Sequence, residues 1–119
     1  MNEVAASAAI FDHRGRILLV FERDAWSYPG GRLEPGETPE QAVVREAREE
    51  AAIEIEAGRL VCTRQWPDDF VLHVFAAEIL SGEPHAPPGI REVGWFDPAG
   101  LPSPSSRALE TLAEVQCVI

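Results

Sequence analysis

The stretch GGRLEPGETPEQAVVREAREEAAIEI, residues 30–55, begins with a glycine pair and continues into a segment dense in glutamate. Thr38 is a good helix N-cap, Pro39 suits the first helical position, and Gln41 completes a capping box. These signals predict a helix that runs from about Pro39 to about Ala51.

Three glutamates of this predicted helix share one face, because Glu49 and Glu50 follow Glu46 by three and four residues. The like charges repel, and a partly buried face of this kind takes up a proton unless a cation lies among the carboxylates. Carboxylate oxygens are ligands of Mg²⁺, so the face is either a metal site or a solvated acidic surface. Gly30 and Gly31 let the backbone come close to a ligand, which favours a site for a metal-bridged polyphosphate.

The rest of the chain alternates between strand signals and turn signals. The pattern predicts two strands joined by a tight turn, a polar loop, a short broken strand, the glutamate helix, three further strands and a last helix. That last helix should be capped by Ser103 or Ser105 and should bury Leu109, Leu112 and Val115. The expected strands are 3–11, 16–22, 26–31, 53–61, 70–80 and 91–96, and the expected loops include 22–27 and 81–90.

Composition limits the classes of function. The 119 residues, 45% of them hydrophobic, fit one globular domain that spans residues 1–119. A net charge of −10 argues against binding to a nucleic acid polymer or to an anionic membrane. All ten basic residues are Arg, so a P-loop lysine and Schiff-base chemistry are excluded.

The sequence has no apolar run of about 18 residues, so we expect no transmembrane helix. The N-terminus lacks the basic segment of a signal peptide, and we therefore expect a cytoplasmic protein. Cys62 and Cys117 match no metal-binding spacing, and we expect both to be free thiols.

Residues 31–53 resemble the Nudix box, the pattern G-x5-E-x7-R-E-U-x-E-E-x-G-U, in which U is a bulky aliphatic residue. The stretches WSYP (26–29) and EVGWF (92–96) are also similar to that family. Two positions depart from the pattern: Ala47 is small for an aliphatic position, and Ala52 replaces the glycine that ends the helix. The residues that match with every gap correct are Gly31, Glu37, Arg45, Glu46, Glu49 and Glu50.

The resemblance implies an α/β protein with the Nudix fold, an α/β/α sandwich with a mixed β-sheet between helices. It also implies a hydrolase that uses Mg²⁺ or Mn²⁺ to attack a phosphoric anhydride bond with water. By resemblance, Glu46, Glu49, Glu50 and the carbonyl oxygen of Gly31 are metal ligands, and Glu49 or Glu50 orients or deprotonates the water. Arg45 and Glu37 would fix the positions of the carboxylates.

The sequence identifies residues that contact the substrate less specifically than it identifies the metal ligands. Arg23 is a candidate phosphate contact, Gly30 a candidate backbone contact, and Trp66 a candidate to line the pocket. An ordinary solvated Arg and a Trp that anchors a loop are the alternatives. Glu92 and Glu83 are candidates for a downstream glutamate that acts as a base or binds another metal ion in some family members, although loop glutamates are usually just solvated.

The expected function is hydrolysis of nucleoside triphosphates to monophosphate and pyrophosphate. ADP-ribose, nucleotide sugars and dinucleoside polyphosphates stay open as alternative substrates. A non-catalytic nucleotide sensor is a further alternative, but such proteins often lose glutamates of the box and this chain keeps them. We expect a nucleotide substrate as the partner and a monomer or homodimer as the assembly.

Overall fold

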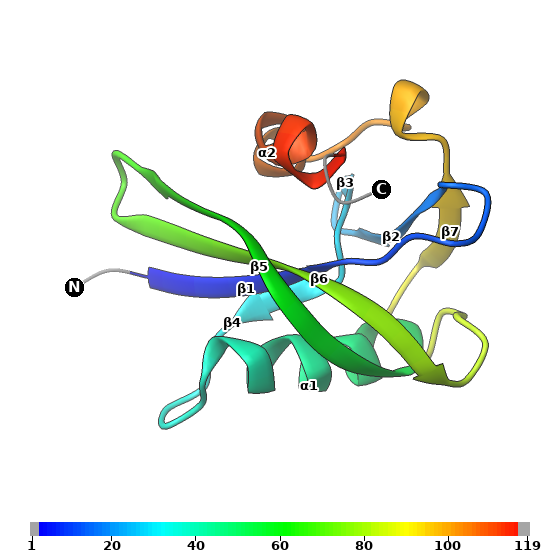
Figure 1. Ribbon diagram of the computed structural model, residues 1–119, viewed down its shortest axis with the longest axis horizontal. Coiled ribbons are helices and arrows are strands. Elements are labelled where there is room, and N and C mark those ends of the chain that lie inside the picture. Colours follow the sequence, from blue (N-terminus) through cyan, green and yellow to red (C-terminus); the bar gives the residue numbers. More distant parts are fainter. Residues whose placement is uncertain (1–2, 117–119) are drawn as a thin grey trace.

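Within residues 3–116, which the computed structural model describes, seven strands form two sheets (Figure 1). In the first sheet only β1 and β6 run parallel, so the sheet is mixed. The second sheet is antiparallel. The first sheet has the order β4 (Gly30–Arg32), β1 (Glu3–Ala9), β6 (Phe70–Ser81) and β5 (Glu54–Trp66), and the second the order β3 (Ala25–Ser27), β2 (Ile17–Glu22) and β7 (Glu92–Phe96).

The two α-helices, α1 (Pro39–Ala51) and α2 (Ser106–Gln116), lie on opposite sides of the strands (Figure 1). A short 3₁₀ turn, η1 (Pro98–Gly100), follows β7. The predicted α/β/α sandwich with a mixed sheet between helices is confirmed.

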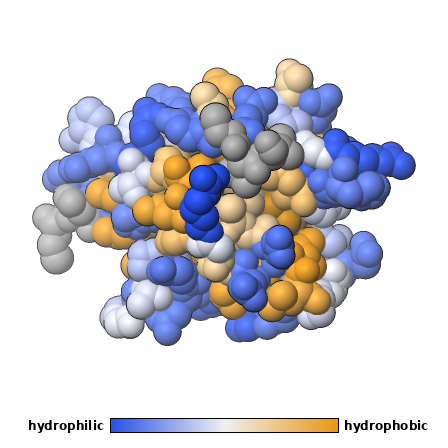
Figure 2. Space-filling model, in the orientation of Figure 1, coloured by the Kyte–Doolittle hydropathy of each residue, from blue (hydrophilic) through white to orange (hydrophobic). Residues whose placement is uncertain are grey.

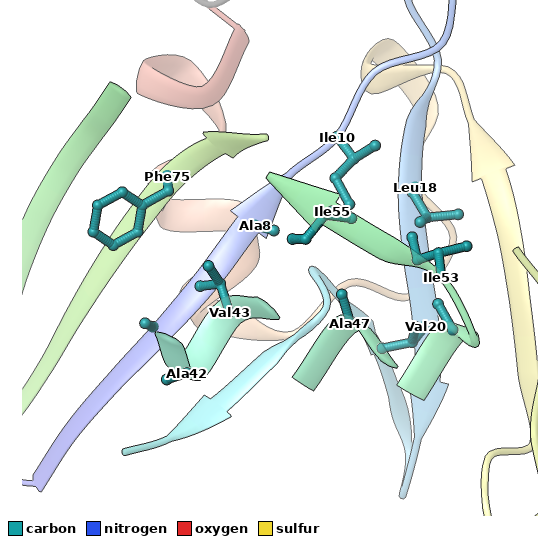
Figure 3. Packing of buried hydrophobic residues seen from close by; sticks show 12 residues of the cluster. Ala8, Ile10, Leu18, Val20, Ala42, Val43, Ala47, Ile53, Ile55 and Phe75 are labelled. Carbon is teal, nitrogen blue, oxygen red and sulfur yellow. The ribbon is translucent and has the colours of Figure 1, made fainter. Parts of the chain in front are cut away.

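Two hydrophobic clusters hold the helices against the sheets. Side chains of successive strand residues point to opposite faces. In β2, Leu18 and Val20 therefore pack on the α1 side, while Ile17 and Leu19 pack on the α2 side. Figure 3 shows the α1 side, where side chains of the helix meet those of the strands. A strand with a continuous apolar sequence, such as β2, therefore packs against both helix layers.

Helix α1 has the bounds that the sequence predicts, and both of its ends have the expected cause. Gln41 N donates to Thr38 Oγ1 (3.1 Å), and Thr38 N donates to Gln41 Oε1 (2.9 Å), which completes the capping box. Ala52 ends the helix in the left-handed conformation, with φ 57°. A glycine would adopt this conformation without steric cost.

Three predictions about secondary structure were wrong. Residues 22–27 are not all loop, because Ala25–Ser27 pairs with β2 as β3 across a turn in which Arg23 has φ 56°. The strand predicted at 53–61 extends to Trp66, because β5 pairs with β6 along most of its length. Of the residues expected on the apolar side of α2, Val115 is buried, but Leu109 is 57% exposed, and the helix buries Ala108 and Thr111 as well.

Ser105, not Ser103, is the residue whose hydroxyl accepts a hydrogen bond from the first turn of α2, from Ala108 N (3.1 Å). Cys62 is a free, half-buried thiol, whereas Cys117 lies outside the described residues. None of the helices in residues 3–116 is long and apolar enough to cross a membrane. Figure 2 shows hydrophilic side chains over much of the visible face, with hydrophobic ones between them.

Candidate functional site

Glu50 of α1 is the buried carboxylate of the candidate site, with 6% of its surface exposed. Its Oε1 accepts a hydrogen bond from Gly30 N (2.8 Å), so the helix is tied to the outer strand β4. The pKa of Glu50 is raised to about 9, first by burial and then by the carboxylates of Glu22 and Glu46, while the Gly30 N–H opposes the rise. A charged Glu50 therefore needs a cation nearby.

Glu46 lies one turn before Glu50 and packs against the second glycine of β4. A Cβ atom built on Gly31 would be 2.7 Å from Glu46 Oε1, so the strand approaches the carboxylate as closely as only a glycine allows. Burial also raises the pKa of Glu46, while its ion pair with Arg45 lowers it.

Arg45 organises the remaining carboxylates. Its Nε and Nη2 donate to the two carboxylate oxygens of Glu37 (2.8 and 3.0 Å), a two-bond geometry that fixes the guanidinium plane. Its Nη1 donates both to Glu46 Oε1 (2.8 Å) and to Glu49 Oε1 (2.9 Å). The hydrogen bonds from Arg45 hold the pKa of Glu37 below its usual value.

The three glutamates of the predicted acidic face do not share one environment. Glu50 is buried and Glu46 is largely covered, but the Glu49 side chain is 55% exposed. The structure therefore brings Glu46 and Glu50 together and leaves Glu49 at the rim, where Arg45 connects it to Glu46.

A cavity of about 640 Å³ opens beside these carboxylates. It is bounded by the β4 backbone, by carboxylates on the α1 side and by arginines from the β2–β3 turn and from α2. The lining residues that matter here are Gly30, Gly31, Glu46, Glu50, Arg23 and Arg107.

The cavity lining also includes residues that the sequence analysis missed, among them Glu22 and Arg107. Glu22 ends β2 and is close enough to Glu50 to raise its pKa. Arg107 is the second residue of α2. No motif marks either residue, because each reaches the cavity only through the tertiary arrangement of its element.

Other candidate residues lie elsewhere. Trp66 does not line this cavity: its Nε1 donates to Glu110 Oε2 (2.5 Å), and its ring packs on Phe70. Glu92 is exposed at the start of β7, opposite Phe21 of β2, and Glu83 is exposed in the loop after β6. Neither glutamate lines the cavity.

The donor chemistry of the cavity fits a hard divalent cation, because two carboxylates whose pKa burial raises, Glu46 and Glu50, lie in its lining beside the backbone of Gly31. Within residues 3–116, no group of three acidic, His or Cys side chains could hold an ion as it stands. Arg45 Nη1 occupies the space between Glu46 and Glu49. Arg45 bonds only Oε1 of each carboxylate, so it leaves Oε2 of Glu46 and of Glu49 without a bond to Arg45.

The comparison with protein families agrees with this geometry: residues 1–114 match the NUDIX domain model. The chain belongs to the Nudix family.

Named relatives are hydrolases with different substrates. The chain is 38% identical over 92 residues to the NAD-capped RNA hydrolase NudC of Pectobacterium carotovorum, an alignment that covers 76% of this chain and 32% of the relative. It is 40% identical over 72 residues to the CTP pyrophosphohydrolase of Escherichia coli, covering 55% of this chain and 53% of the relative. The chain thus spans only about a third to a half of these two relatives.

Among solved structures, an ADP-ribose pyrophosphatase from Streptococcus suis superimposes with a TM-score of 0.86 at 27% identity, covering 99% of this chain and 92% of the other. The predicted family is confirmed by the family model, and the relatives named here are hydrolases.

Proposed function

We propose that the protein is a Mg²⁺- or Mn²⁺-dependent pyrophosphohydrolase of nucleoside diphosphate-X compounds. Its proposed substrates are nucleoside triphosphates, which react with water to give a nucleoside monophosphate and pyrophosphate. The observation that supports this function best is the cavity that joins the carboxylates of Glu46 and Glu50 to the arginines Arg23 and Arg107. Acidic residues that attract cations and arginines that attract phosphate are both required to bind a metal–polyphosphate complex.

In this proposal Glu46, Glu49, Glu50 and the carbonyl oxygen of Gly31 hold the divalent ion. Such an ion neutralises phosphate charge and lowers the pKa of a bound water. The Gly30 N–H keeps one oxygen of Glu50 in a fixed place and leaves the other available. Glu49 is the most exposed of the three glutamates, so its carboxylate can turn toward a water molecule that enters from solvent.

The chain's own residues supply the positioning that phosphoryl transfer requires. Arg45 and Glu37 hold the glutamates of α1 in register with β4. Arg23 forms no ion pair with any residue in the described part of the chain, so its charge is available for a phosphate group. Trp66 and Glu92 have no role in this proposal.

A screen of nucleotides with Mg²⁺ and Mn²⁺, with identification of both products, tests the function. Glu49→Gln should lower turnover by roughly 10²- to 10⁴-fold, because it removes a group that handles the attacking water. Glu40→Gln is the matched control, since Glu40 is an exposed glutamate of the same helix that, unlike Glu49, forms no ion pair with Arg45. Equal turnover in Glu49→Gln and Glu40→Gln would show that the chemistry occurs elsewhere.

Metal binding has a test that does not depend on turnover. A ligand that binds only the folded state raises the melting temperature. Mg²⁺ should therefore stabilise the wild-type protein, and Glu46→Gln and Glu50→Gln should each reduce this effect. A melting temperature that Mg²⁺ leaves unchanged would contradict the proposed metal site.

ADP-ribose is the second candidate substrate, because the similarity to the solved ADP-ribose pyrophosphatase covers nearly the whole chain. The products separate the two candidates. A nucleoside triphosphate gives pyrophosphate, whereas ADP-ribose gives AMP and ribose 5-phosphate.

A further inference from the structure

Strand β5 forms an open edge of the first sheet (Figure 1). It pairs with β6 along one side, and no strand within residues 3–116 pairs with its other side. An open edge presents backbone N–H and C=O groups that can pair with another chain. The middle of this edge, residues 56–60, is largely exposed, so a partner can reach it.

A β-bulge lies in the middle of the edge. Between Ala57 and Leu60, two residues of β5 lie opposite one residue of β6. The extra residue interrupts the alternation of side chains between the two faces. Glu56 and Arg59 are three residues apart, yet both line one hollow on the same face. Gly58 lies inside the bulge, and a glycine within a strand often marks a site where another backbone comes close.

The face opposite α1 carries charges without partners. Ala57 packs on the α1 side, so the neighbouring Glu56 points to this opposite face. A hollow of about 430 Å³ there is lined by Glu56, Arg59 and Glu78. Glu56 lies directly opposite Glu78, and like charges in this position destabilise a sheet. None of the three forms an ion pair with another residue of the described range, so the edge holds two carboxylates without a cation and one arginine without an acid.

The other face of the same edge is apolar. Ile55 pairs with Ile79, and Leu60 pairs with Phe75. Ile79 and Phe75 belong to the α1 side of the core, and directly opposed residues share a face, so Ile55 and Leu60 lie on that side too. Leu60 is 47% exposed and Leu80 is 63% exposed. A second hollow, of about 420 Å³, has apolar walls from Val44, Ile55, Ala57 and Leu80.

Two copies of this edge have complementary charges when they run antiparallel about a two-fold axis between Ala57 and Gly58. Glu56 of each copy then lies opposite Arg59 of the other copy. Both side chains project from the face opposite α1, so each charge gains a partner of opposite sign. At the axis itself Ala57 faces Gly58, which has no side chain to separate the two strands.

The apolar side chains fit in the same register. Ile55 of each copy lies opposite Leu60 of the other copy, and both are on the α1 side. The exposed Leu60 therefore reaches the apolar hollow of the other copy, where Leu80 is also exposed. A single register thus satisfies the charges on one face and covers the leucines on the other. A two-fold interface requires a surface that is complementary to itself in this way.

We propose that the protein forms a two-fold symmetric homodimer through the edge of β5. Charges on an open edge usually keep other strands away. Here their order accepts the same edge of a second copy and repels an edge with like charges in this register. Glu56, Arg59 and Leu60 do not line the cavity beside Glu46 and Glu50, so the inference does not depend on the proposed function.

Sedimentation velocity of the whole chain, from micromolar to hundreds of micromolar concentration, measures this association. The wild-type protein should reach twice the 13.0 kDa mass of one chain. Arg59→Glu and Glu56→Arg should each raise the dissociation constant at least about tenfold, because each places like charges opposite each other. A wild-type protein that stays monomeric at the highest concentration would overturn the proposal, as would two variants that dimerise like the wild type.

A mixture of these two variants tests the register itself. In a heterodimer of Arg59→Glu with Glu56→Arg, a glutamate lies opposite an arginine at both positions. The mixture should therefore form heterodimers as tightly as the wild type forms homodimers, although each variant alone associates weakly. The double variant Glu56→Arg/Arg59→Glu should regain the homodimer for the same reason. A mixture that associates no better than its components would overturn the proposal.

Arg14→Glu is the matched control, because it makes the same change of charge at an exposed arginine that lines neither hollow. It should dimerise like the wild type, and an equal loss of the dimer in Arg14→Glu would count against specific pairing. Leu60→Asp should weaken the dimer at an unchanged melting temperature, since Leu60 is exposed in the monomer. A dimer that Leu60→Asp leaves intact would overturn the proposed register. Absence of hydrolysis in the wild-type protein would contradict the proposed function and leave the dimer unaffected.

Discussion

The two glycines of β4 give the sharpest test of how the strand supports the site. A Cβ atom on Gly31 would be 2.7 Å from Glu46 Oε1, which is the end of a flexible side chain. A Cβ atom on Gly30 would be 2.4 Å from Ala6 O and 2.6 Å from Ser7 Cα, which are backbone atoms of the paired strand β1. The same substitution by Ala should therefore have different consequences at neighbouring positions.

In Gly31→Ala the Glu46 carboxylate has to retreat from 2.7 Å to an ordinary separation of 3.4–4 Å, a shift of about 0.7–1.3 Å. A misplacement of about 1 Å at a reacting centre lowers the rate about 10²-fold, so we expect turnover to fall roughly tenfold to hundredfold. The free energy of unfolding should change by less than about 1 kcal/mol, because a side chain can move without opening the sheet. In Gly30→Ala the strands must separate, which should cost about 1–3 kcal/mol or more.

Urea denaturation and turnover, measured on both variants, separate these effects. The expected result is a stable, slow Gly31→Ala protein and a destabilised Gly30→Ala protein. Wild-type turnover in Gly31→Ala would refute the close approach of β4 to the site carboxylate, and equal destabilisation of the two variants would refute the distinction between them.

Three other predictions follow from local geometry. Ala52→Gly should raise the free energy of unfolding by about 0.5–1 kcal/mol, because Ala52 has φ 57°; a urea titration that shows no gain would contradict this. Tyr28→Phe should lower that free energy by about 1 kcal/mol, since it removes the buried hydrogen bond to Ala108 O; thermal and urea unfolding both measure it. The pKa of Glu37 is lowered by Arg45, so its stabilising effect is present above the usual pKa of a carboxyl group and is lost as the pH falls through the lowered value. Glu37→Gln should therefore flatten the loss of stability between pH 7 and about pH 3, and an unchanged slope would count against the ion pair as its source.

The sequence predicts the parts of the fold that depend on local signals. Capping by Thr38 and Gln41 sets the start of α1, and the period of the helix places its apolar stripe. The Nudix box then identifies the glutamates beside the cavity, because the motif is a fixed set of spacings along one helix and one turn.

Features that depend on tertiary contacts could not be predicted in the same way. Glu22 and Arg107 line the cavity only because the fold brings the end of β2 and the start of α2 to the same cavity as β4. The difference in exposure between Glu49 and Glu50 depends on where β4 lies against the helix. The Gly30 N–H of β4 donates to Glu50, whereas the side chain of Glu49 is 55% exposed. Apolar spacing predicts that Leu109 lies on the buried side of α2, but the structure buries Thr111 there. The Thr111 hydroxyl can be buried because it donates to Arg107 O (2.9 Å), a contact that the spacing of apolar residues does not predict.

The placement of α1 and α2 on opposite sides of the sheet has an evolutionary consequence. Helix α1 packs on one hydrophobic cluster and α2 on the other. Apolar substitutions in α2 can therefore accumulate without compensating changes in the cluster that supports the glutamates of α1.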